Sequence, residues 1–187
     1  MNAPADAIAS NVRTLFPGYF AMVMATGIIA IGSLQQDLVW LADGLYVIAA
    51  VTYVVLVVLL VSRIVLAPKL FAAHVTSHAK GFAFLTTVAA TNVLGAASAL
   101  VHGWWDLAWG LWWLSLGLWA FFVYAPLFAG VLKGPKPGLD HGINGTWFLL
   151  TVATESVVVL GALQLPRHPS DAFAFGLLAA FALGLVL

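Results

Sequence analysis

The sequence has few charged residues and no cysteine. Of its 187 residues, 7% are charged and 63% are hydrophobic, whereas soluble domains carry roughly 25% charged and about 45–50% apolar residues. So few ionised side chains cannot cover the surface of a soluble domain of this length. The absence of cysteine excludes disulfides, thiolate metal ligands and a cysteine nucleophile. The composition therefore predicts an integral membrane protein.

Several functional motifs are also missing. Seven Lys and Arg balance seven Asp and Glu, so nothing indicates a nucleic-acid partner. No phosphate-binding loop, nucleophile elbow or dinucleotide fingerprint occurs. His74 and His78 have the spacing of a zinc site, but neither a carboxylate nor a cysteine lies beside them in the sequence. We therefore expect no metal, no cofactor and no catalytic residues. Residues 1–15 also lack the apolar run of a signal peptide.

Long apolar runs dominate what is present. A helix needs about 20 apolar residues to cross the bilayer. The predicted spans are Pro17–Leu34, Leu45–Leu66, Phe82–Val101, Ala108–Leu132 and Thr146–Leu165, with an incomplete sixth from Ala172 to Leu187. We expect one all-α transmembrane domain over residues 1–187. Because the last run stops without a polar tail, we also expect an N-terminal fragment of a longer transporter.

Basic residues alternate between the predicted loops. If the N-terminus is cytoplasmic, the inner face holds six of the seven, and only Arg167 is outside; the six are Arg13, Arg63, Lys69, Lys80, Lys133 and Lys136. This bias predicts a multi-pass protein of the plasma (inner) membrane with its N-terminus in the cytoplasm. Lys69, Lys80, Lys133 and Lys136 are candidates for a cytoplasmic mouth that attracts anions. The same pattern also arises from topology alone.

The first, third and fifth spans share the dipeptide Ala-Thr at mid-helix. Thr26, Thr91 and Thr154 are separated by 65 and 63 residues, which indicates a repeated helical hairpin. These odd spans carry small and hydroxyl residues, whereas the even spans carry bulky apolar ones. Small and polar faces serve helix contacts or a water-filled path, so we expect odd helices inside, lining a pore, and even helices outside. The alternative is that each Thr only packs and bonds its own helix.

Glu155 is the one charged side chain deep within a predicted span. A charged residue at that depth costs about 2.5–3.5 kcal/mol on insertion scales, so it requires a reason. A proton-carrying role is one, and a neutral Glu155 bonded to a neighbouring helix, for instance through Asn92, is the other. The candidate pathway residues are Thr26, Gly27, Thr87, Thr91, Asn92, Thr154 and Glu155.

Three segments carry a resemblance to a known family. They are Phe16-Pro17-Gly18-Tyr19-Phe20-Ala21-Met22-Val23-Met24-Ala25-Thr26-Gly27-Ile28, Lys80-Gly81-Phe82-Ala83-Phe84 with Thr91-Asn92, and Asn144-Gly145-Thr146-Trp147. With these the chain resembles the tellurite-resistance/dicarboxylate transporter family. The bacterial C4-dicarboxylate and malic acid transport branch is the most similar. Yeast malate and sulfite carriers and the slow anion channels of plant guard cells belong to the same family.

The resemblance implies a fold and a function. Family members have ten helices in five hairpins around a quasi-fivefold axis, and they commonly form trimers in the lipid bilayer. The implied function is transport of a small anion, either a C4-dicarboxylate such as malate or a sulfite- or tellurite-type oxyanion, and not catalysis. The gating phenylalanine of the channel members lies on a ninth helix, which has no counterpart here. The alternative function is a non-transporting membrane subunit or an inactive truncated product.

Overall fold

The computed structural model describes residues 15–77, 80–132 and 145–187. Within these ranges the chain forms seven α-helices and three short 3-10 helices, and it forms no strand. Five helical segments are long and apolar enough to cross a membrane. The prediction of an all-α polytopic membrane protein is thereby confirmed.

The helices follow the apolar runs closely. Their bounds are η1 Pro17–Tyr19, α2 Phe20–Gln35, α3 Val39–Leu66, α4 Pro68–Val75, η2 Gly81–Phe84, α5 Leu85–His102, α6 Trp105–Leu132, η3 Gly145–Trp147, α8 Phe148–Gln164 and α9 Asp171–Val186. The second span begins at Val39 rather than Leu45, because a tight turn at Asp37, with φ of 59°, ends α2 and lets α3 start at once.

A short helix, α4, occupies the stretch that the sequence predicted as a loop. Pro68 is at its first position, where the missing proline N–H costs no intrahelical hydrogen bond. At its far side, Gly81 approaches Val75 so closely that a Cβ there would collide with the Val75 carbonyl oxygen. Helix α4 therefore folds back under the bundle and joins α3 to α5.

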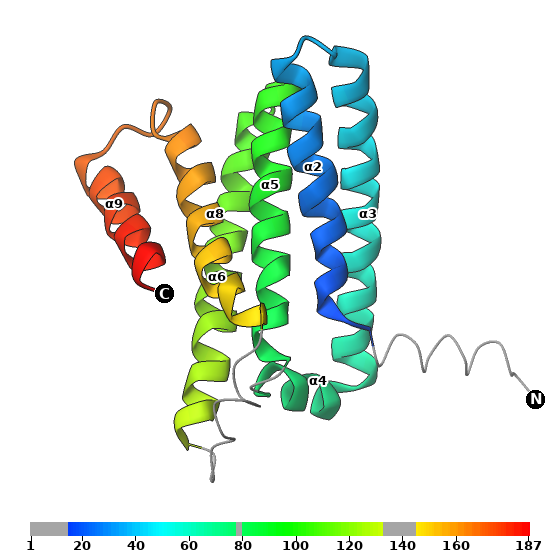
Figure 1. Ribbon diagram of the computed structural model, residues 1–187, viewed down its shortest axis with the longest axis vertical. Coiled ribbons are helices and arrows are strands. Elements are labelled where there is room, and N and C mark those ends of the chain that lie inside the picture. Colours follow the sequence, from blue (N-terminus) through cyan, green and yellow to red (C-terminus); the bar gives the residue numbers. More distant parts are fainter. Residues whose placement is uncertain (1–14, 78–79, 133–144) are drawn as a thin grey trace, which may run out of the picture.

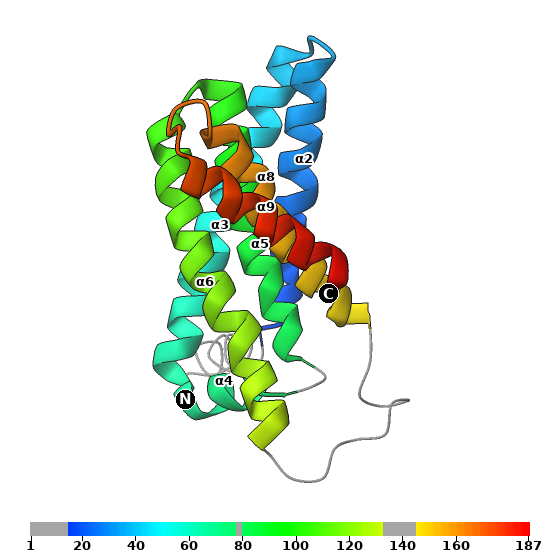
Figure 2. The same cartoon turned by 90° about the vertical axis from the view of Figure 1, so that its left-hand side faces the viewer.

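The helices lie in two layers (Figures 1 and 2). Helix α5 packs between α2 and α8, and these three odd spans form an inner arc, while α3 and α6 pack against its outer side. Helix α9 packs across α8. In the most apolar stretch of α5, 83% of the residues are buried, compared with 28–33% in the other four spans. Helix α5 is therefore the centre of the bundle.

Glycines allow the inner helices to approach closely. A Cβ at Gly27 of α2 would lie 2.7 Å from Val93 Cγ1 of α5, and one at Gly95 of α5 would lie 2.6 Å from Leu160 Cδ2 of α8. Such small-residue contacts are the usual packing of helices in lipid, where no hydrophobic force drives association. The outer faces are apolar, as on α3, where Val51, Val54 and Val58 are exposed.

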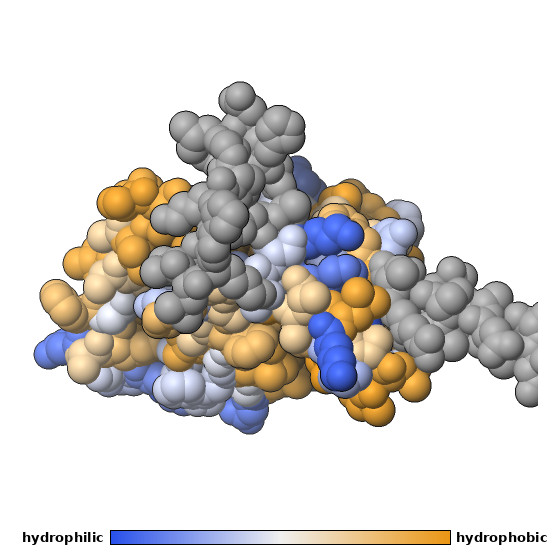
Figure 3. Space-filling view, turned by 90° about the horizontal axis from the view of Figure 1, so that it is seen from below, coloured by the Kyte–Doolittle hydropathy of each residue, from blue (hydrophilic) through white to orange (hydrophobic). Residues whose placement is uncertain are grey.

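The end of the bundle that carries α4 is a mixed surface. Seen from that end, hydrophilic residues form separate patches among hydrophobic ones (Figure 3). Arg63, Lys69 and Lys80 belong to the segments at this end, whereas Arg167 follows α8 at the opposite end. The structure thus separates these basic residues as the loop pattern predicted, and a cytoplasmic N-terminus stays a prediction.

Candidate functional site

Two tyrosines on α3 bond the polar side chains of α5. Tyr53 Oη lies 2.8 Å from Thr91 Oγ1, and Tyr46 Oη lies 3.0 Å from Ser98 Oγ. Each of the two α5 hydroxyls donates to a carbonyl one turn back on its own helix, at 2.7 Å. Since a hydroxyl has one proton, the tyrosines are the donors across the interface. We name Tyr46, Tyr53, Thr91 and Ser98 the first seam.

Two tryptophans on α6 form equivalent hydrogen bonds to α8. Trp119 Nε1 donates to Thr154 Oγ1 at 2.9 Å, and Trp112 Nε1 donates to the Val157 carbonyl at 3.0 Å. Gly161 has no side chain at the position that faces Trp112, where a Cβ would lie 2.9 Å from the indole nitrogen. We name Trp112, Trp119, Thr154 and Gly161 the second seam.

The two seams are copies of one arrangement. Trp112 and Trp119 follow Tyr46 and Tyr53 by 66 residues each, and Thr154 and Gly161 follow Thr91 and Ser98 by 63. The hairpin repeat predicted from Ala-Thr therefore has a structural basis: each outer helix bonds the next inner helix. Sequence analysis missed the aromatic partners, although aromatic pairs seven residues apart on both even spans were a usable signal.

Asn92 joins three helices at mid-membrane. Ser115 of α6 donates to Asn92 Oδ1 at 2.6 Å, and Asn92 Nδ2 donates to Ser156 Oγ of α8 at 2.9 Å. Asn92 and Ser115 are buried. The amide that the sequence suggested as a partner for Glu155 thus bonds Ser115 and Ser156.

Glu155 lies against α9. A Cβ at Gly184 would overlap its carboxylate, so Gly184 makes room for this side chain. Glu155 Oε1 is buried and has no hydrogen-bond partner among the described residues. The structure therefore places the intramembrane carboxyl between α8 and the short sixth helix.

The other pathway candidates on α2 and α5 have different surroundings. Thr26 is half-buried and donates to the Met22 carbonyl of its own helix at 2.8 Å. Gly27 is buried against Val93. Thr87 is buried, and its hydroxyl has no partner within the described part of the chain. Thr91, Asn92 and Thr154 belong to the helix interfaces described above, and a pathway role for all seven candidates stays a prediction.

The structure describes two of the four lysines that the sequence suggested for a cytoplasmic mouth. Lys69 on α4 and Lys80 before η2 are exposed, at the same end of the bundle. Lys133 and Lys136 lie outside the described residues. No group of three or more His, Cys, Asp or Glu that could hold a metal occurs among the residues described.

Helix α5 is partly exposed at a few positions. Along α5 between Leu85 and Leu100, Val93 and Leu100 are the partly exposed residues, seven positions apart and hence on one face. Val93 lies at the contact with Gly27 of α2. Helices α2 and α8 both pack against α5 and lie on either side of it in Figure 1.

An inner arc of closely packed helices, bonded to an apolar outer layer, defines an all-α polytopic membrane protein. Residues 14–187 match the model of the voltage-dependent anion channel (SLAC1) family, and the chain belongs to that family. The resemblance to the transporter family that includes the slow anion channels is thus confirmed, and membership implies anion channel or transport activity. Searches of curated proteins and of solved structures each returned no match.

Proposed function

We propose that the inner arc of α2, α5 and α8 lines a pathway for small anions. The observation that carries the proposal is the position of α5, which contacts α2, α3, α6 and α8 and is partly exposed at Val93 and Leu100. In this layout the seams hold the outer helices against the inner ones and leave the opposite face of the arc to the anion. Among the candidates named from the sequence, Thr26 on α2 has a partly exposed side chain, and we expect it to line the pathway.

The proposed substrate is a C4-dicarboxylate such as malate, or a sulfite- or tellurite-type oxyanion. Family membership supports an anion, and the sequence resemblance supports these classes. Selectivity in a pathway with apolar walls depends on its width and on a few hydrogen-bond donors. A flux assay with oxyanions of different size therefore distinguishes among these candidate substrates.

A proton linkage through Glu155 is part of the proposal. An ionisable side chain within a membrane span is a candidate functional residue, and the Glu155 oxygen Oε1 is buried without a hydrogen-bond partner in the described structure. Because the carboxyl contacts α9, protonation would act on the contact between α8 and α9 and so on the outer wall of the arc.

Topology and assembly complete the proposal. The six-to-one distribution of basic residues supports a cytoplasmic N-terminus in the plasma membrane. The resemblance supports a trimer and an arrangement of helical hairpins around a shared axis. In this arrangement α2, α5 and α8 face that axis.

The test is anion uptake into proteoliposomes that contain the complete gene product. We expect saturable uptake of labelled malate or sulfite, and we expect Glu155→Gln to flatten its dependence on pH. Asp171→Asn is the matched control, because this exposed carboxyl begins α9 outside the apolar stretch. Absence of uptake for every anion would favour a non-transporting subunit. Unchanged pH dependence in Glu155→Gln would leave Glu155 a packing residue.

A further inference from the structure

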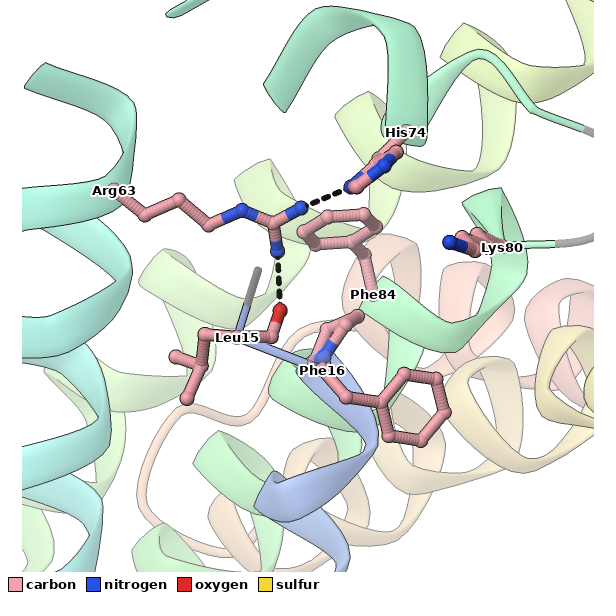
Figure 4. A pocket seen from close by; sticks show the side chains of 7 residues that line it. Leu15, Phe16, Arg63, His74, Lys80 and Phe84 are labelled. Carbon is pink, nitrogen blue, oxygen red and sulfur yellow. Dashed lines mark hydrogen bonds between the residues drawn. The ribbon is translucent and has the colours of Figure 1, made fainter. Parts of the chain in front are cut away.

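Arg63 is a buried cation at the end of α3. Its side chain is 1% exposed, and its guanidinium lies 5.5 Å from the ring centre of Phe84 and 6.0 Å from that of Phe71. Nη1 donates to the Leu15 carbonyl at 2.6 Å, and Nη2 bonds Nδ1 of His74 (Figure 4). Nε is buried without a partner among the described residues.

No carboxylate neutralises this cation in the part of the chain that the structure describes. The four described aspartates, Asp37, Asp43, Asp106 and Asp171, lie at the opposite end of the bundle, and Glu155 lies at mid-membrane. A buried charge without an opposite charge is costly, because its hydration is lost and nothing replaces it. The Leu15 carbonyl, the His74 imidazole and two aromatic faces are neutral, so they compensate only part of that loss. Among the groups that the structure describes, none supplies a negative charge to Arg63, and an anion could supply it.

A small cavity opens beside the guanidinium. It measures about 40 Å³, and it is lined by Arg63, His74, Lys80, Phe84, Leu15, Phe16 and Pro17. One water needs roughly 10–15 Å³ measured in this way. The space accordingly fits a small inorganic ion or one anionic oxygen of a larger group. Its polar side chains are three nitrogen groups from three separate segments of the chain (Figure 4).

Burial and the positive charges around this cavity lower the pKa of His74. Partial burial lowers its pKa, and the positive charges of Arg63 and Lys80 lower it further. Nδ1 accepts from a guanidinium that has only donors, so His74 is neutral in this arrangement. Of the charged groups described, Arg63 on α3 and Lys80 before η2 are those that act on His74.

We propose that Arg63, His74 and Lys80 form an anion-binding site that takes a small inorganic anion or one anionic oxygen of a phosphate group, and that occupancy is coupled to protonation of His74. An anion supplies the negative charge that the cavity lacks, which favours the charged form of His74. Once protonated, Nδ1 donates instead of accepting, so Arg63 and His74 both donate to the anion. By linkage, acid pH then tightens anion binding. The site lies apart from the proposed pathway face and does not depend on that proposal.

The test is the His74 pKa, measured by NMR of ¹⁵N-histidine in nanodiscs and assigned with His74→Gln. We compare gluconate, chloride and inorganic phosphate in phosphatidylcholine, and gluconate alone in phosphatidylglycerol. We expect an occupying anion to raise the His74 pKa by about one pH unit, which corresponds to about tenfold tighter anion binding to protonated His74. A shift with added chloride or phosphate identifies a free ion, and a shift with phosphatidylglycerol identifies a lipid headgroup.

Charge variants decide whether the shift belongs to this site. Arg63→Gln is expected to abolish the anion-dependent shift, and Lys80→Gln, an exposed position, to reduce it without affecting the fold. Arg167→Gln is the matched control, because it removes a positive charge at the other end of the bundle, where Arg167 stacks on Trp105 at 4.3 Å. An identical His74 pKa in all four conditions would overturn the proposal, and so would a shift that persists unchanged in Lys80→Gln.

Discussion

The first and second seams perform the same task with different residues. In the first seam, tyrosine hydroxyls meet the hydroxyls of Thr91 and Ser98. In the second, indole nitrogens meet Thr154 and a backbone carbonyl, and Gly161 stands where the first seam has Ser98. A larger ring on the outer helix is thus matched by a smaller residue on the inner one. The repeat preserves an aromatic donor on the outer helix at both levels and a threonine acceptor at one of them, and it exchanges Ser98 for Gly161 at the other.

The difference also shows which positions tolerate change. The first seam has a polar side chain on both helices at both of its levels, so loss of a tyrosine leaves Thr91 or Ser98 still bonded to a carbonyl of its own helix. The second seam depends on steric fit at Gly161, where Leu177 of α9 also approaches. We therefore expect volume changes to be more damaging in the second seam than losses of hydrogen bonds in either.

The largest effect is expected for Gly161→Val. The new side chain would overlap Leu177 and Trp112 and separate α8 from both α6 and α9, at a cost of about 1–3 kcal/mol in the free energy of unfolding. Gly117→Val on α6 is the control, because a Cβ there has open space around it. Reversible unfolding in mixed micelles measures both. Equal losses in the two variants would show that Gly161 is not a packing constraint.

A smaller loss is expected for Asn92→Ala, which lies between the seams. It leaves the hydroxyls of Ser115 and Ser156 without their shared amide, although each retains a backbone carbonyl. We expect about 1–2 kcal/mol by the same unfolding assay. Thr26→Val is the comparison, since Thr26 bonds only its own helix among the interactions described. A loss in Thr26→Val as large as that in Asn92→Ala would contradict this ranking.

The comparison is sharpened by converting part of one seam into the other. Trp112→Tyr with Gly161→Ser places in the second seam the pair that Tyr46 and Ser98 form in the first. We expect the double variant to be more stable than the sum of the single changes predicts, by at least about 0.5 kcal/mol. A double-mutant cycle of unfolding free energies gives this coupling directly. Strict additivity would mean that the two seams are not equivalent.

The smallest effect lies outside both seams, at His74. Because burial and the charges of Arg63 and Lys80 lower the His74 pKa, the unfolded chain binds a proton more readily than the folded chain. The stabilisation from neutral His74 is present above the unfolded pKa of about 6.5 and is lost as pH falls below it. In low-chloride buffer the thermal midpoint should fall more between pH 7.5 and 5.5 for the native chain than for His74→Gln. Parallel curves would refute this linkage.

Much of the fold could be predicted from the sequence, because lipid imposes simple demands. Apolar runs of sufficient length located the five spans, and the Ala-Thr spacing located the hairpin repeat. The partners of Thr91 and Thr154 could not be predicted in this way. A threonine on a helix has the same local pattern whether its hydroxyl faces a pore, a neighbouring tyrosine or its own backbone. The aromatic pairs seven residues apart on the even spans were a signal for partners on a neighbouring helix, and the packing of α3 and α6 against α5 and α8 shows which partner each threonine has.

Glu155 and Arg63 show the same limit for charged residues. The position of Glu155 within a span marked it as exceptional, but its contact with Gly184 depends on how α9 crosses α8. Arg63 looked like one of six basic loop residues. Its contact with His74 depends on how α4 folds back toward the end of α3. Pro68 and Gly81 set that fold rather than charge, so the charge pattern of the sequence could not predict the contact.

The most direct test of the proposed pathway is the reactivity of single cysteines toward a water-soluble, negatively charged thiol reagent. The sequence contains no cysteine, so Val93→Cys, at a partly exposed position of α5, can be compared with Val54→Cys on the exposed outer face of α3, each in the protein reconstituted in membranes. The account predicts that the thiol at position 93 reacts, that the reaction slows anion uptake, and that the thiol at position 54 stays unmodified in lipid. An unreactive thiol at position 93 together with a reactive one at position 54 would contradict it.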